Sequence, residues 1–186
     1  METKQKLILA SGSPRRAELL QSAGVDFIIQ KPETDETPRA GESPSAFAER
    51  AAVEKAEWFQ IGGDEIVIGA DTVVTIDGQI LGKPAGAADA VSMLQLLSGR
   101  THEVITGVCL RSAERTVSFA VVTSVEFRVL SAGEIAMYVA SGEPMDKAGA
   151  YAIQGGAAGM VRRIDGSYSN VVGLPLCETI EELRNF

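Results

Sequence analysis

Residues 7–16 constrain the fold most strongly, because they join a strand pattern to a helix pattern through two small hydroxyl residues. The first four are apolar and typical of a buried strand, and Ser11 and Ser13 follow. Ser13 precedes Pro14, which favours a helix with Ser13 as N-cap and proline at its first position. We expect this helix to end at Gly24. The order strand, turn, helix predicts an α/β protein.

Two arginines, Arg15 and Arg16, lie in the first turn of this expected helix. Cations are disfavoured there, because the helix macrodipole is already positive at its N-terminus. A phosphate among the free backbone N–H groups would favour both arginines. A solvent-exposed arginine pair is the alternative, and this segment alone leaves both interpretations open.

Composition restricts the partners of the chain. Its 186 residues suit one domain, expected over residues 1–186. The net charge of −8 argues against nucleic acid and against an anionic membrane, whereas a small phosphorylated ligand requires only a local cluster of cations. No apolar run is long enough for a membrane span or a signal peptide. Cys109 and Cys177 are expected to be reduced and buried, which fits a cytoplasmic protein.

His102 is the only histidine, so a Ser-His-Asp or Cys-His nucleophile would have to use it. The chain has no Gly-x-Ser-x-Gly elbow to supply the partner. Neither cysteine has a neighbour at the spacing of a zinc site. A bound metal would therefore be held by carboxylates, which suits Mg²⁺ or Mn²⁺.

Beyond residue 24, strands and helices are expected in an irregular order, which predicts a mixed sheet rather than a regular doubly wound one. Expected strands cover residues 26–30, 66–70, 73–76, 79–81, 102–111 and 116–129. Expected helices cover residues 43–59, 87–97, 131–142 and 175–184. We place Val125, Phe127 and Val129 on one strand face, and a hairpin across Asp165 and Gly166.

Asp71 is the second strong feature, because residues 66–74 are otherwise apolar or small. A carboxylate there is costly unless a cation, a metal or several N–H groups offset its desolvation. Such an acid beside a metal could deprotonate water. The alternative is an aspartate at a strand end that caps a turn.

Lys55 raises the same question on the helix expected from residue 43. Ala48, Ala52, Lys55 and Phe59 form one helical stripe, so the lysine lies on an inward face. It either extends its ammonium to solvent, the commoner outcome, or meets a buried anion.

Together, six motifs resemble the Maf family, the septum-formation-inhibitor-like nucleoside triphosphate pyrophosphatases. They occur in order along nearly the full chain, at residues 11–16, 69–72, 83–84, 97–99, 143–155 and 173–175. The resemblance implies an elongated mixed α/β sheet flanked by helices, with two lobes and a deep central cleft. It also implies an enzyme that is often a homodimer.

The resemblance further implies roles for particular residues. Asp71 is expected to be the proton acceptor and, with Glu36, to bind Mg²⁺ or Mn²⁺. Thr34 stands where the family usually has an aliphatic residue, which leaves Asp35 open as an alternative to Glu36. The expected substrate-binding residues are Ser11, Arg15, Arg16, Lys55, Thr72, Lys83, Lys147 and Gln154.

Arg15, Thr72 and Gln154 resemble the branch of the family that acts on dTTP and UTP, with modified pyrimidine nucleotides as further candidates. The branch acting on 7-methyl-GTP tends to carry Trp, Gln and Glu at these points. A fixed glutamine amide can accept from N3–H and donate to O4, an edge that thymine and uracil share. A link of this activity to cell-division arrest is also expected. The alternatives are a purine (7-methyl-GTP) pyrophosphatase and a non-catalytic nucleotide-binding regulator of septation.

Overall fold

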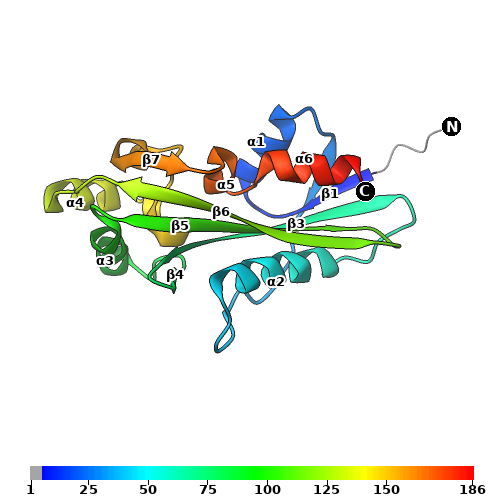
Figure 1. Cartoon of the computed structure of the whole chain (residues 1–186), viewed down its shortest axis with the longest axis horizontal. Coiled ribbons are helices and arrows are strands. Elements are labelled where there is room, and N and C mark those ends of the chain that lie inside the picture. Colours follow the sequence, from blue (N-terminus) through cyan, green and yellow to red (C-terminus); the bar gives the residue numbers. More distant parts are fainter. Residues whose placement is uncertain (1–5) are drawn as a thin grey trace.

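The computed structural model describes residues 6–186, which form one seven-stranded mixed sheet (Figure 1). The strand order is β2-β1-β3-β5-β6-β7, and β4 pairs with β3 beside this path. β1 runs parallel to both β2 and β3, and the other pairs are antiparallel. The strands are β1 (Lys6–Ala10), β2 (Phe27–Gln30), β3 (Glu65–Ile76), β4 (Gln79–Leu81), β5 (Thr101–Arg111), β6 (Thr116–Phe127) and β7 (Val161–Asp165). The predicted mixed sheet is confirmed.

Six helices flank the sheet within the described residues. They are α1 (Pro14–Ser22), α2 (Pro44–Glu57), α3 (Ala87–Leu97), α4 (Ala132–Ala140), α5 (Tyr168–Val172) and α6 (Leu176–Arg184). Figure 1 shows α2 on one face of the sheet and α1, α5 and α6 on the other. In residues 6–186, no helix has the length and apolar character needed to span a membrane.

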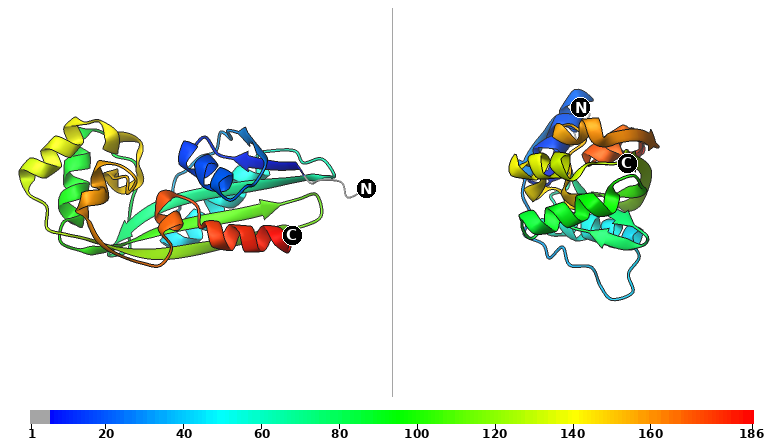
Figure 2. Two further views of the ribbon diagram at one scale, coloured as in Figure 1. Left: turned by 90° about the horizontal axis from the view of Figure 1, so that it is seen from above. Right: turned by 90° about the vertical axis from the view of Figure 1, so that its left-hand side faces the viewer.

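The molecule is elongated and has two ends (Figure 2). The β1 end contains β1, β2, α1 and α6. The α4 end contains β4, β7, α3, α4 and three 3-10 turns, η1 (Glu143–Asp146), η2 (Ala148–Ala150) and η3 (Gly156–Met160). The long strands β3, β5 and β6 run from one end to the other. This arrangement confirms the two predicted lobes.

Strand β3 differs from the prediction in a way that matters for the site. Two separate strands were expected on either side of Asp71, but β3 continues through it, and Asp71 pairs with Gly107 of β5. The alternative of a turn-capping aspartate is therefore wrong. The Asp71 carboxylate is buried within the continuous strand because a cation lies beside it, as described below.

Helix α2 lies unusually close to the sheet because two glycines face it. A Cβ atom on Gly69 would lie 2.1 Å from the carbonyl oxygen of Ala52, and one on Gly107 would lie 2.1 Å from that of Ala48. Such distances are far inside van der Waals contact, so only glycine fits at either position. This close approach brings Lys55, one turn further along α2, against β3.

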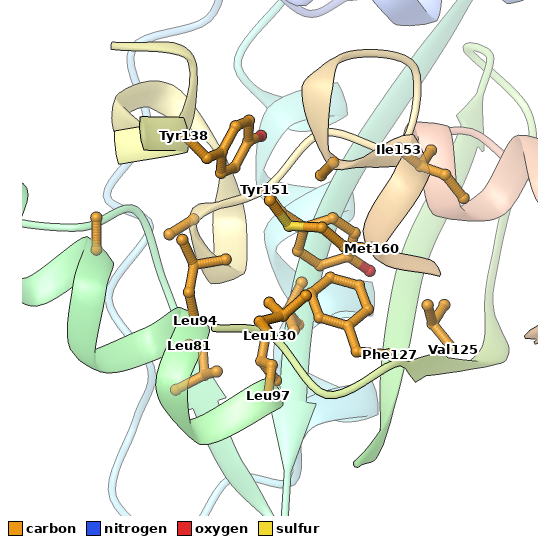
Figure 3. Packing of buried hydrophobic residues seen from close by; sticks show 14 of the residues in the cluster. Leu81, Leu94, Leu97, Val125, Phe127, Leu130, Tyr138, Tyr151, Ile153 and Met160 are labelled. Carbon is orange, nitrogen blue, oxygen red and sulfur yellow. The ribbon is translucent and has the colours of Figure 1, made fainter. Parts of the chain in front are cut away.

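The hydrophobic core differs between the ends. At the α4 end, Leu94, Phe127, Tyr138 and Tyr151 belong to a large cluster between the sheet and helices α3 and α4 (Figure 3). The β1 end has smaller clusters on the two faces of the sheet. Their buried members are Leu9, Leu20, Ile68, Ala70, Val108, Leu110 and Leu174 on one face, and Ile8, Ala10, Ala52, Ala56, Val67 and Cys109 against α2.

Three local predictions were wrong. Val129 lies beyond β6 and is 75% exposed, because the strand ends at Phe127. No hairpin crosses Asp165 and Gly166 in the described chain, since the Ser167 side chain caps the short helix α5, which the sequence analysis missed. Cys177 is exposed on α6, whereas Cys109 is buried as predicted.

Candidate active site

A cavity of about 700 Å³ opens between the two ends. Its walls come from the β1–α1 junction, α2, β3, the segment after β2, the turns η1 and η2, and residues 151–154 that follow them. Each site residue predicted from the sequence contributes to them: Ser11, Arg15, Arg16, Glu36, Lys55, Asp71, Thr72, Lys83, Lys147 and Gln154. Residues that are far apart in the sequence are thus brought together in one cleft, and the predicted deep cleft is confirmed.

Two carboxylates converge on one buried ammonium at the floor of the cleft. Lys55 Nζ lies 2.6 Å from Asp71 Oδ1 and 2.7 Å from Glu36 Oε1. Lys55 is 6% exposed and Asp71 7%, so each charge offsets the desolvation of the other. Lys55 therefore meets a buried anion, and the alternative of an ammonium extended to solvent is wrong.

Glu36 closes this group from the mouth of the cleft, with 44% of its side chain exposed. Partial burial raises its pKa, but the ammonium of Lys55, with help from Lys83 and Arg16, outweighs this and holds the pKa below its usual value. Asp35, the open alternative, instead accepts hydrogen bonds from the backbone and hydroxyl of Thr37. The geometry therefore favours Glu36 as the carboxylate that acts with Asp71.

Arg50 of α2 fastens the segment that carries Glu36. Its guanidinium donates to Glu42 Oε1 at 2.6 Å, to Glu54 at 3.0 Å and to the carbonyl oxygen of Thr37 at 3.1 Å. Thr37 directly follows Glu36 in the chain, so this contact restrains the backbone beside the carboxylate. The sequence analysis missed Arg50, because the contact joins a loop to a helix turn 13 residues later.

Arg16 is held rigidly at the β1 end of the cleft. Its Nε donates to the carbonyl oxygen of Gly173 at 2.7 Å, Nη1 to Ser11 Oγ at 3.1 Å and Nη2 to Thr72 Oγ1 at 3.0 Å. Burial lowers its pKa, yet an arginine remains charged in a protein. Since a guanidinium has five N–H groups, two remain for an anion in the cleft. Arg16 is thus not part of a solvent-exposed pair.

Arg15 is half-buried and also lines the cleft. The helix begins at Pro14 as predicted, but within residues 6–186 the Ser13 side chain makes no capping hydrogen bond. Instead, the Ser13 backbone N–H donates to Ser11 Oγ at 3.1 Å. The hydroxyl of Ser11 therefore ties the turn to Arg16, so Ser11 organises this corner.

A chain of hydrogen-bonded groups that begins at Thr72 supports Arg16. Thr72 Oγ1 accepts from Arg16 and lies 2.9 Å from Thr106 Oγ1, whose hydroxyl donates to the carbonyl oxygen of Asn170 at 3.2 Å. Thr72 Oγ1 also lies 3.3 Å from the carbonyl oxygen of Gly173, so its single proton has two acceptors within reach and the contact between the threonines does not fix which one donates. Thr106 and Asn170 are buried and were missed by sequence reasoning, since neither stands in a charged or glycine-rich motif.

Two further lysines reach the cleft from the α4 side. Lys83 is largely exposed, and its Nζ lies 4.0 Å from Glu36 Oε2. Lys147 is mostly buried and pairs with the exposed Asp146, whose pKa is lowered by that hydrogen bond. Gln154 faces the same cleft from an exposed position between η2 and η3. The α4 side of the cleft therefore contributes two cations and an amide, opposite the guanidinium of Arg16.

The carboxylate pair offers the oxygen donors that Mg²⁺ and Mn²⁺ prefer. Among residues 6–186, no group of three or more His, Cys, Asp or Glu side chains is placed to hold a metal ion. Asp71 and Glu36 each direct one oxygen at Lys55 Nζ, which leaves the second oxygen of each carboxylate for a metal ion. Mg²⁺ is commonly bound by one or two carboxylates with substrate phosphates and water completing its shell, so these residues fit such a site.

His102 takes no part in the cleft. It is 2% exposed in the core of the α4 end, with Nε2 2.9 Å from the Tyr151 hydroxyl and its ring edge against Phe127. Burial lowers the pKa of His102 from 6.5 to about 4, so the ring is neutral at pH 7. A histidine-activated nucleophile is therefore excluded for this chain.

The fold itself is shared with solved structures of one class. A HAM1 protein from Coxiella burnetii superposes with a TM-score of 0.56 over 98% of this chain and 100% of that one, at 19% identity. The architecture is therefore that of the HAM1-like mixed α/β proteins, with the cleft between two lobes.

Sequence comparison identifies the family within that class. A family model described as Maf-like protein matches residues 6–186, and the chain belongs to this family, as its motifs predicted. A dTTP/UTP pyrophosphatase of Geobacter metallireducens is 53% identical over 99% of this chain and 97% of its own length. A dTTP/UTP pyrophosphatase of Bacillus cereus is 50% identical over 100% and 92%.

Proposed function

We propose that this protein hydrolyses dTTP and UTP to the nucleoside monophosphate and pyrophosphate. The observation that carries the proposal is one cleft that combines a buried carboxylate, at least three cations and an amide. Relatives that are 50% or more identical over nearly the full chain are named dTTP/UTP pyrophosphatases. A binding protein without turnover would not require a carboxylate buried beside Lys55.

We further propose that Asp71 and Glu36 hold a Mg²⁺ or Mn²⁺ ion together with the phosphates. Such an ion neutralises phosphate charge and makes a bound water more acidic. In the reaction, Asp71 accepts the proton of the attacking water, while the bond between the α- and β-phosphates breaks. No covalent intermediate is needed, which suits a site without an activated nucleophile.

The cations act on the leaving group. Arg15, Arg16, Lys55, Lys83 and Lys147 surround the cleft and stabilise the charge that develops on the departing pyrophosphate. Arg16 is oriented before the substrate arrives, because Gly173, Ser11 and Thr72 fix three of its N–H groups. Such preorganisation avoids rearranging the donors during the reaction.

Gln154 supplies base recognition in this proposal. Its amide accepts from N3–H and donates to O4, groups that thymine and uracil present alike. Cytosine presents the reverse pattern at these two atoms. A mispaired buried hydrogen bond costs on the order of 1–3 kcal/mol, so CTP should be roughly ten- to a hundredfold poorer.

The deciding experiment measures pyrophosphate release from a panel of dTTP, UTP, CTP, GTP and 7-methyl-GTP. We expect dTTP and UTP to have similar kcat/KM values and the other nucleotides lower ones. A preference for 7-methyl-GTP would overturn the pyrimidine assignment and leave the reaction class standing. Tight nucleotide binding without turnover would instead indicate a regulator.

Metal dependence is tested separately on the same enzyme. EDTA should abolish pyrophosphate release, and added Mg²⁺ or Mn²⁺ should restore it, since an oxygen-only site suits hard cations. Titration of the apoprotein with Mn²⁺, followed by electron paramagnetic resonance with and without nucleotide, gives a readout independent of turnover. Full activity in metal-free buffer would show that the protein's own cations suffice.

A further inference from the structure

The turn that carries Gln154 is fastened on both sides by one pair of side chains. Tyr138 of α4 and Glu143 of η1, here called the Tyr138–Glu143 pair, are joined by a hydrogen bond of 2.9 Å from the tyrosine hydroxyl to Glu143 Oε1. Tyr138 is 7% exposed and packs at the edge of the core shown in Figure 3. The pair is thus anchored in the hydrophobic core of the α4 end.

Each member of the pair holds the backbone beside Gln154. The Ala152 backbone N–H donates to the Tyr138 hydroxyl at 3.0 Å. The Gly156 backbone N–H donates to both carboxylate oxygens of Glu143, at 3.0 and 3.1 Å. These contacts lie two residues before and two residues after Gln154, so the amide projects from a segment fixed at both flanks.

Two more observations show how closely this segment is held. The Gly155 N–H donates to the carbonyl oxygen of Ala152 at 3.1 Å, which closes a turn around Gln154. A Cβ atom on Gly155 would lie 2.1 Å from Glu143 Oε1, so the carboxylate rests directly against the backbone and any larger residue at this position would displace it. Burial and the Glu143 carboxylate both raise the pKa of Tyr138, which keeps its hydroxyl protonated as a donor.

We infer that Tyr138 and Glu143 are positioning residues for base selection, acting through Gln154 without touching the substrate. This inference rests on the proposed function, in which Gln154 pairs with N3–H and O4 of the base. An amide discriminates thymine from cytosine only if it is presented to the base edge in one position, and that position is set by the backbone from which the side chain projects. The Tyr138–Glu143 pair supplies the restraint on the backbone from which that amide projects.

Two conservative variants test this inference. Tyr138→Phe keeps the ring in the core and removes only the hydroxyl, and Glu143→Gln keeps the shape and removes the charge. We expect kcat/KM for dTTP to fall about tenfold in each, with CTP nearly unchanged, so the dTTP/CTP ratio falls about tenfold. The double variant should lose little more, because both residues hold one turn.

The controls separate base selection from folding and from phosphate binding. Tyr168→Phe removes a half-exposed hydroxyl for which residues 6–186 show no hydrogen-bond partner, and it should leave the ratio unchanged. Inorganic tripolyphosphate, used as a competitive inhibitor without a base, should bind the Tyr138 and Glu143 variants within twofold of wild type. A purely structural role would lower kcat/KM for all nucleotides alike.

An unchanged dTTP/CTP ratio in both variants overturns the inference. So does an equal loss on all nucleotides. If Gln154→Glu still changes the ratio in that case, the proposed function stands and only the positioning role falls. A wild-type enzyme with no preference for dTTP over CTP contradicts the base-recognition part of the proposed function, and the inference falls with it.

Discussion

The two walls of the cleft are built by different means. At the β1 end, Ser11, Arg16, Lys55 and Asp71 stand on or beside regular strands and helices, and their side chains bind one another directly. At the α4 end, Gln154 stands on the turn between η2 and η3, which is held by side-chain contacts to the backbone. The regular elements fix the charged groups that every triphosphate requires. A turn tolerates more changes of sequence than a strand or helix does, so it suits the residues that select the base.

The largest effect should come from the β1 end. Asp71→Asn should lower kcat by about 10²- to 10⁴-fold for every nucleotide, because it removes the proton acceptor. The dTTP/CTP ratio of the residual activity should stay the same, since the α4 end is untouched. Asp77→Asn, at an exposed aspartate of the β3–β4 hairpin, is the matched control. A folded Asp71 variant with half the wild-type turnover would refute the assignment.

A somewhat smaller loss is expected for Lys55→Met, which keeps the length of the side chain and removes its charge. We expect kcat/KM to fall on the order of a hundredfold, as for loss of one preorganised electrostatic group. Stability should also fall, by about 3–5 kcal/mol, since Asp71 is left buried without its cation. Urea denaturation of this variant and of Lys6→Met, an exposed lysine, measures the difference. Equal stabilities would mean that the ion pair is not needed for folding.

Gln154→Glu changes the α4 end of the cleft, where we propose that the base is selected. An ionised carboxylate cannot donate to O4, so the preference for dTTP over CTP should shrink by roughly ten- to a hundredfold. Inhibition by inorganic tripolyphosphate should hardly change, because the cations remain in place. If tripolyphosphate binding also collapsed, the two walls would not act separately.

Lowering the pH should reduce the free energy of unfolding through His102, which lies in the core of the α4 end. Its pKa is about 4 when folded against 6.5 when unfolded, so stability is complete above pH 6.5 and lost as the pH falls toward 4. The loss amounts to about 3 kcal/mol, because the unfolded state binds a proton that the folded state excludes. His102→Leu should remove this part of the pH dependence, measured as unfolding free energy from pH 7 to 4. An unaltered pH dependence would assign the acid response to other groups.

Sequence patterns predicted most of the regular elements at both ends, including α1 at the β1 end and β4, α3 and α4 at the other. The strand–turn–helix of residues 7–16 and the inward stripe of α2 follow from local rules of capping and periodicity, and both were found. The pairing of Lys55 with Asp71 and Glu36 was left open, because it depends on how closely α2 approaches the sheet. Gly69 and Gly107 permit that approach, and only the paired register of β3 and β5 places them under one helix.

The contacts around Gln154 could not be predicted from capping signals or from hydrophobic periodicity. Tyr138 resembles an ordinary core residue of an amphipathic helix, and Glu143 an ordinary acid after a helix end. Their roles arise from backbone N–H groups 13 and 14 residues away, within turns that have no periodicity. The missed helix α5 has the same cause, since five residues are too few for a helical pattern.

The unbroken strands β3, β5 and β6 have a mechanical consequence. Hinged enzymes bend where a few loop residues connect two bodies, but here 12, 11 and 12 residues of continuous strand pass beneath the cleft. The continuous sheet therefore connects the two lobes rigidly, and neither lobe rotates freely relative to the other. The segment between β2 and α2, which contributes Glu36 to the cleft, is likewise held in place, because Arg50 donates to the carbonyl oxygen of Thr37.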